Sequence, residues 1–276
     1  MASTAGQLSP TDTGAAGPSA RRTSPTGTAA TRVLGIAVLV GMAWLLFFGL
    51  FASPGDVVQR DSVRIMYVHV PSAWLAYLAF VVTAIASAAY LWRRTRSLTW
   101  DRIAGASAEI GVLFMGIALV TGSLWGSVTW GTYWVWDARL TTTAFLFVTY
   151  VGYLAVRRLG GSHEARARRS AVLALLAVLE IPLVHFSVVL WRPLHQEASV
   201  ANPTGDVEMD GLMLFSLFVG IIAFTLLYVW LLLHQQRVLA MEDAIDDRGL
   251  DLALAERQRE AVIGSTGVTA RGEVSS

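Results

Sequence analysis

The chain has 276 residues, of which 54% are hydrophobic and only 15% are charged. Soluble domains contain about 25% charged residues, so this composition indicates an integral membrane protein. The net charge of +1 gives no indication of a nucleic-acid partner, and the absence of cysteine excludes disulfides and thiolate metal sites.

Six apolar segments follow a tail, residues 1–32, whose Ser, Thr, Pro, Gly and Ala content predicts disorder. Each segment is close to the roughly 20 residues that a helix needs to cross the hydrocarbon core. They are residues 33–51, 68–92, 103–124, 140–156, 171–191 and 211–233. We therefore expect an all-α integral membrane protein with six transmembrane helices in a domain at 33–235. Residues 236–276 would form a C-terminal tail, in which 241–262 has the pattern of an amphipathic helix.

The distribution of arginine predicts the orientation of these spans. Nine arginines lie in the connections 93–102 and 157–169, whereas the alternate connections hold four, namely Arg60, Arg64, Arg139 and Arg192. Positively charged loops stay in the cytoplasm, so both termini are expected there. Residues 52–67, 125–139 and 192–210 are then expected on the external face.

Residues 125–139, WGSVTWGTYWVWDAR, contain four of the ten tryptophans: Trp125, Trp130, Trp134 and Trp136. If this segment is an amphipathic helix lying on the membrane, Trp130 and Trp134 share one face. Gly126 and Gly131 would then leave room for a flat ligand. Two interpretations remain open, an interfacial aromatic belt and a surface for a planar apolar ligand.

Asp137 and Arg139 end the same segment. The two side chains could pair with one another, or Asp137 could cap the fourth span in competition with Thr141–Thr143. Arg139 otherwise suits a carboxylate of a ligand. Inside the spans, Glu109 and Glu180 are the conspicuous carboxylates, and Glu180 precedes Pro182 in a helix that we expect to be kinked.

Three histidines, His69, His185 and His195, fall on the external side with the tryptophans. Neutral imidazole is a common ligand of metals and of haem iron, although a single interfacial histidine is more often a hydrogen-bonding or solvated residue than a ligand. No HExxH motif or carboxylate cluster accompanies them, which disfavours a zinc or di-iron site. His163 and His234 lie at cytoplasmic ends and are interpreted as ordinary interfacial residues.

Three segments together resemble a known family: TGSLWGSVTWGTYWVWDARLT, RIMYVHVPSAW and IPLVHFSVVLWRPLHQ. They are similar to the tryptophan-rich WWD haem-handling proteins of cytochrome c maturation, and within that group to the CcmC family. The resemblance covers roughly residues 33–235. It implies axial haem ligation by His69 and His195. It also implies that His185 lies close to these ligands without binding the iron itself. It also implies a haem surface formed by Trp125, Trp130, Trp134, Trp136, Asp137 and Arg139.

The resemblance further implies a bacterial inner-membrane protein that binds haem b transiently and non-covalently on the external face. Such a protein loads haem onto the chaperone CcmE and acts with an ABC-type complex of CcmA, CcmB and CcmD. The absence of cysteine agrees with a protein that passes haem on. We expect a delivery platform that assists haem attachment to CcmE, with no catalytic residue of its own, and the sequence leaves open whether it is an enzyme.

Three alternatives remain. A membrane b-type cytochrome or quinone-linked electron-transfer protein would hold haem between facing histidines inside the bundle, where only His185 is expected. A substrate channel would need a run of polar residues along a span. A CcsA-like protein of system II also carries a WWD segment, but it has more spans.

Overall fold

A computed structural model of the chain describes residues 27–191, 194–195 and 209–272, with side chains as far as Glu260. In this part of the chain, six helices or helix pairs are long and apolar enough to cross a membrane. They are Ala29–Ala52, Asp61–Leu91, Leu98–Thr129, Ala138–Arg157, His163–Trp191 and Gly211–Glu260. The six predicted spans are confirmed, and the chain is a multi-pass membrane protein.

The first span begins earlier than its apolar run predicts. Helix α1 (Ala29–Leu46) starts at Ala29 because the hydroxyl of Thr28 accepts a hydrogen bond from the Thr31 amide at 3.3 Å, which caps the helix. It continues into η1 (Phe47–Ala52), one turn of π-helix. Most of the tail predicted to be disordered, residues 1–26, lies outside the described residues.

Helices α2 (Met66–Leu91) and α3 (Leu98–Thr129) form the centre of the bundle, and η2 (Asp61–Ile65) leads into α2. On α3 a seam of mostly small residues repeats with alternating spacings of four and three: Ala104, Ala108, Gly111, Met115, Ala118 and Gly122. A Cβ on Gly111 would lie 2.5 Å from the Phe80 ring on α2. Small residues let membrane helices approach closely, which is how this pair packs.

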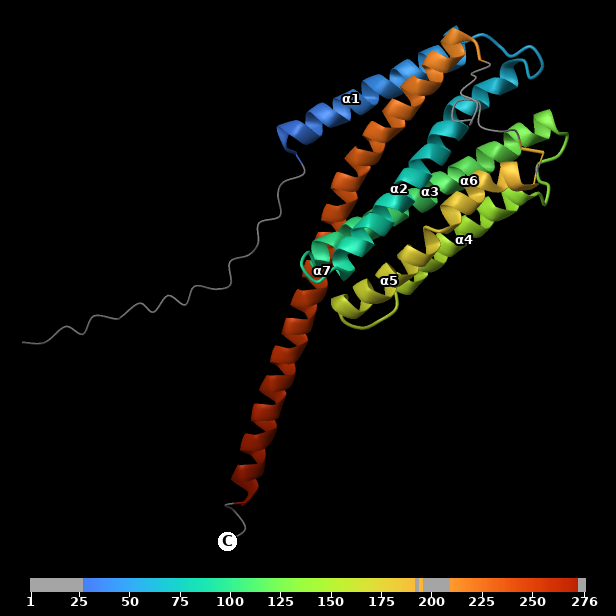
Figure 1. Cartoon of the computed structure of the whole chain (residues 1–276). Coiled ribbons are helices and arrows are strands. Elements are labelled where there is room, and N and C mark those ends of the chain that lie inside the picture. Colours follow the sequence, from blue (N-terminus) through green and yellow to red (C-terminus); the bar gives the residue numbers. More distant parts are fainter. Residues whose placement is uncertain (1–26, 192–193, 196–208, 273–276) are drawn as a thin grey trace, which may run out of the picture.

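The remaining helices flank this pair on two sides (Figure 1). On one side α1 packs against α7 (Gly211–Gly272). On the other side α4 (Ala138–Arg157) packs against α5 (His163–Ala177) and α6 (Glu180–Trp191). The connections that precede α2 and α4 lie at one end of the bundle, together with the first residues of α7. We call it the tryptophan end because it carries residues 130–137.

The fifth span is broken, as its proline predicts. Helix α5 ends at Ala177 and α6 begins at Glu180, with Pro182 in its first turn. One carboxylate oxygen of Glu180, Oε2, is buried without a hydrogen-bond partner among the described residues. Glu109, the other carboxylate expected in a span, accepts a 2.6 Å hydrogen bond from the amide of Gln235 on α7.

Helix α7 is continuous across the boundary expected between the membrane domain and the C-terminal tail. It runs from Gly211 to Gly272, so residues 241–262 extend the last span and do not form a separate amphipathic helix. Figure 1 shows this extension projecting well beyond the other helices. Among the described side chains of the extension, Asp243 is the one most fully buried.

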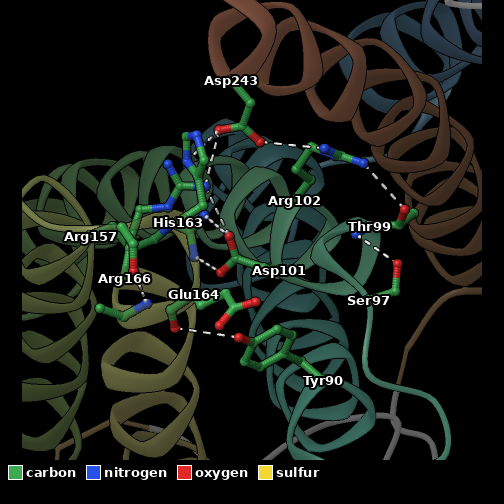
Figure 2. A network of polar contacts seen from close by, with 12 residues as sticks. Tyr90, Ser97, Thr99, Asp101, Arg102, Arg157, His163, Glu164, Arg166 and Asp243 are labelled. Carbon is green, nitrogen blue, oxygen red and sulfur yellow. Dashed lines mark hydrogen bonds and ion pairs between the residues drawn. The ribbon is translucent and has the colours of Figure 1, made fainter. Parts of the chain in front are cut away.

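Asp243 belongs to an ion network at the bundle end opposite the tryptophans, which we call the arginine end (Figure 2). Asp101 on α3 receives a two-point contact from Arg157 on α4, with N–O distances of 2.5 and 3.1 Å. Arg166 on α5 bridges Asp101 and Asp243, at 3.2 and 3.0 Å. His163, interpreted from sequence as an ordinary interfacial residue, contacts both Asp243 and Asp247. The network therefore joins α3, α4, α5 and α7.

Candidate functional site

The tryptophan segment is not a helix lying on the membrane. Helix α3 extends through Trp125 to Thr129, residues 131–137 have no helical structure, and α4 begins at Ala138. Gly131, at φ +73°, directly follows the C-cap residue Trp130 in the left-handed conformation that commonly ends a helix. The expectation that Trp130 and Trp134 share a helix face is therefore wrong.

The two glycines of the segment differ from one another. A Cβ on Gly126 would lie 3.1 Å from the Trp130 ring, so this glycine makes room for Trp130 and leaves no space for a ligand. Around Gly131 nothing lies within 4 Å of such a Cβ. Trp134 and Trp136 meet edge to face at 5.5 Å, and Trp136 is 82% exposed. The free space and the exposed indole of the segment, at Gly131 and Trp136, therefore both lie after the end of α3.

His69 lies in the first turns of α2 and is held by the facing side of α3. Its Nδ1 is 3.0 Å from the carbonyl oxygen of Ala118 and 3.2 Å from the hydroxyl of Thr121. A carbonyl can only accept, and the single Thr121 proton is directed to the Ile117 carbonyl at 2.7 Å. Nδ1 must therefore carry the proton, which leaves the lone pair of the neutral ring on Nε2.

The ring of His69 meets Trp125 edge to face, with 5.8 Å between ring centroids. The Trp125 indole in turn donates a 2.7 Å hydrogen bond to Gln59 in the loop before α2. This loop is fixed by Asp56, whose carboxylate accepts from the amides of Val58 and Gln59 at 2.8 and 2.7 Å. These amide donors also hold the pKa of Asp56 below its usual range.

His195 lies on the same side of the bundle, in the connection between α6 and α7. Its ring is 6.2 Å from that of Trp130, and it is close enough to His69 for the two rings to interact electrostatically. The neighbouring Arg192 and Pro193 lie outside the described residues. The structure thus brings together the two histidines and two tryptophans that the sequence separates by up to 126 positions.

Asp137 caps α4, as one of the two sequence-based alternatives expects: its Oδ1 accepts from the Leu140 amide at 2.8 Å. The described side chains of Asp137 and Arg139 do not form an ion pair with one another. The Arg139 guanidinium instead donates to the carbonyl of His185 at 3.3 Å and interacts with Tyr77. Three buried polar atoms here have no hydrogen-bond partner among the described residues: Trp134 Nε1, Asp137 Oδ2 and Arg139 Nε.

His185 contributes its backbone to this arrangement. Its side chain is exposed on α6 and its ring packs edge to face on Phe186 at 5.2 Å. The carbonyl of His185 is the atom that contacts Arg139. The residue therefore lies beside the site, with its imidazole directed elsewhere.

This donor set suits a flat, iron-containing macrocycle with carboxylates. Two imidazoles can ligate iron, indole rings can cover an apolar face, and the unpartnered N–H groups of Trp134 and Arg139 can bind an anionic edge. A bare metal ion is a poorer fit, because the described residues include no group of three His, Cys, Asp or Glu side chains that could hold one. The sequence alone did not identify Gln59, Thr121 or Gly122 as part of this site. Thr121 and Gly122 precede Trp125 by four and three positions, so a helix through this stretch places both of them beside Trp125.

The family model for heme exporter protein C matches residues 16–249. Heme exporter protein C of Bradyrhizobium diazoefficiens is 45% identical over 70% of this chain and 73% of its own length. Those of Haemophilus influenzae and Escherichia coli are 39% and 35% identical, each over 74% of this chain and 81% of their own length.

Proposed function

Because the chain belongs to the heme exporter protein C family, we propose that it handles haem for cytochrome c maturation and presents it at the tryptophan end. The observation that carries the proposal is the meeting of His69 with Trp125 and of His195 with Trp130 in one place. The two histidines come from different parts of the chain, so their approach is a property of the fold.

In this proposal His69 and His195 ligate the iron of haem b from its two faces. The Nε2 atom of His69 is the ligand atom, because Nδ1 is engaged with α3. Trp125 and Trp130 orient the two imidazoles, while Trp134, Trp136, Asp137 and Arg139 form the surface against the ring and its carboxylates. Ligation by two side chains without a covalent bond permits release, which suits delivery better than storage.

Transfer needs an accessible edge, and the tryptophan end provides one. Trp136 is 82% exposed and Tyr133 is 64% exposed beside the buried donors. We propose that this edge meets the chaperone CcmE on the external face of a bacterial inner membrane, with CcmA, CcmB and CcmD as further partners. The arginine distribution supports that orientation, because the arginine end would then be cytoplasmic.

The ligand assignment is tested by the haem absorption spectra of purified His69→Ala and His195→Ala proteins. We expect each to lose haem affinity by at least about tenfold and to change its Soret band. His185→Ala and His234→Ala are matched controls: the first ring packs on Phe186, and the second bonds the Trp230 carbonyl near the arginine end. Wild-type haem content and spectra in both ligand variants would refute the assignment.

The delivery role is tested by isolating the full chain with CcmE from membranes. We expect CcmE to co-purify with haem, and His69→Ala to reduce the haem carried by CcmE. A membrane b-type cytochrome would instead retain its haem in the presence of CcmE and pass electrons from a quinol. That outcome would replace delivery by electron transfer.

A further inference from the structure

One face of α3 forms a seat for the His69 imidazole. Ala118, Thr121, Gly122 and Trp125 are spaced i, i+3, i+4 and i+7, so they lie on the same side of the helix. Each contacts the ring in a different way: Ala118 by its carbonyl, Thr121 by its hydroxyl, Gly122 by close approach and Trp125 edge to face.

Gly122 is needed at its position for steric reasons. A Cβ built there would lie 2.9 Å from Cε1 and 3.3 Å from Nδ1 of His69. Real Cβ atoms essentially never approach another heavy atom as closely as the first distance, so a side chain would displace the imidazole. Gly122 also ends the α2–α3 seam that includes Gly111 and Ala118. The packing of the two helices therefore sets the position of His69.

Thr121 and the Ala118 carbonyl decide which nitrogen of His69 is protonated. Both act as acceptors towards Nδ1, since the Thr121 proton is directed to Ile117. A ligating histidine generally gives its second N–H to such a partner, which fixes the tautomer and ring orientation and raises the basicity of the ligand.

We propose that Thr121 and Gly122 are positioning residues for haem binding, which hold His69 in the tautomer and ring plane that present Nε2 to the iron. The inference rests on the proposed function, because it concerns the same site. It adds two residues on a second helix that contact the ligand side chain and act through it.

The test is a haemin titration of the purified full-length chain with Gly122→Ala or Thr121→Val, read by affinity, Soret spectrum and reduction potential. Two substitutions of the same chemistry serve as controls. Gly116→Ala adds a Cβ to α3 that meets only Phe147, at 3.6 Å. Thr142→Val removes a hydroxyl whose hydrogen bonds go to carbonyls of its own helix, those of Ala138 and Arg139.

We expect Gly122→Ala to weaken haem binding by about 10- to 100-fold and to lose the spectrum of iron with two histidine ligands. Added imidazole should restore that spectrum, because the iron site persists and only the ligand is displaced. Thr121→Val should keep most of the affinity, within about tenfold, but raise the reduction potential, because a less basic imidazole stabilises ferric iron less. Both controls should match the wild type.

Several outcomes would overturn the inference. If His69→Ala loses haem while Gly122→Ala and Thr121→Val match the wild type in affinity, spectrum and potential, the seat has no role and the proposed function stands. If His69→Ala also matches the wild type, the ligand assignment fails and the inference with it. Should Gly122→Ala fail to fold, the potential of Thr121→Val decides: an unchanged value overturns the inference.

Discussion

The indole nitrogen of Trp125 donates a 2.7 Å hydrogen bond to the side-chain oxygen of Gln59, 66 positions earlier in the chain. This bond ties the loop before α2 to the end of α3. Trp125 also packs against His69, a proposed haem ligand. The loop therefore helps to position His69 indirectly, through Trp125.

Gln59→Leu should destabilise the protein, because the half-buried indole N–H loses its acceptor. An unsatisfied buried donor costs about 1–3 kcal/mol. Trp125→Phe removes the donor, so adding it to Gln59→Leu should cost less than the sum of the two single changes. Denaturation in detergent, followed by circular dichroism, measures this, with Gln258→Leu on the exposed part of α7 as control. Strict additivity would show that the bond contributes nothing.

Asp137→Ala should lower stability by about 1 kcal/mol, the usual effect of losing an N-cap. Asp137→Asn keeps an oxygen for the Leu140 amide, so its stability should stay close to that of the wild type. Thermal unfolding of the two variants separates the capping oxygen from the negative charge. Equal losses in both variants would assign the effect to the charge.

Asp101→Asn should be strongly destabilising, because it leaves Arg157 without its charged partner and Arg166 with Asp243 alone. The Asp101 side chain is only 2% exposed, and breaking a buried ion pair costs about 3–5 kcal/mol. Asp247→Asn is the control, since that side chain is 67% exposed and its contact with His163 should contribute about 0–1 kcal/mol. Denaturant titrations of both variants should differ clearly, and similar midpoints would contradict the role of the network.

Gly111→Ala should disturb the α2–α3 seam, because the added Cβ would lie 2.5 Å from the fully buried Phe80 ring. Phe80 stacks on Tyr150 at 3.6 Å between centroids and has little room to move. Overpacking of this kind costs about 1–3 kcal/mol. Gly152→Ala, where nothing lies within 4 Å, should be neutral or slightly stabilising in the same unfolding assay. A Gly111→Ala protein as stable as the wild type would refute close packing of the seam.

The orientation can be measured by cysteine labelling, because the chain has no cysteine of its own. Val58→Cys, in the loop before α2, should react with a membrane-impermeant maleimide in intact spheroplasts, since Val58 is 86% exposed. Gly160→Cys, between α4 and α5, should react only after permeabilisation. The reverse pattern would invert the proposed topology.

The sequence by itself determined the six spans, the α5–α6 break and the composition of the tryptophan segment. These are local properties: an apolar run sets a span, and Pro182 disfavours a continuous helix. The end of α3 was also readable, because Gly131 follows the last helical residues as a left-handed C-terminal glycine does. The expectation of a helix through Trp130 and Trp134 did not take this glycine into account.

Only the tertiary structure decided which of these residues meet. His69 and Thr121 are 52 positions apart, and Asp101 and Asp243 are joined through Arg166 on a third helix. Such contacts depend on the rotation and relative height of each helix, which small residues such as Gly111 and Gly122 fix by close packing. For the same reason, periodicity alone could not tell that the ring of His195 faces Trp130 while that of His185 lies against Phe186.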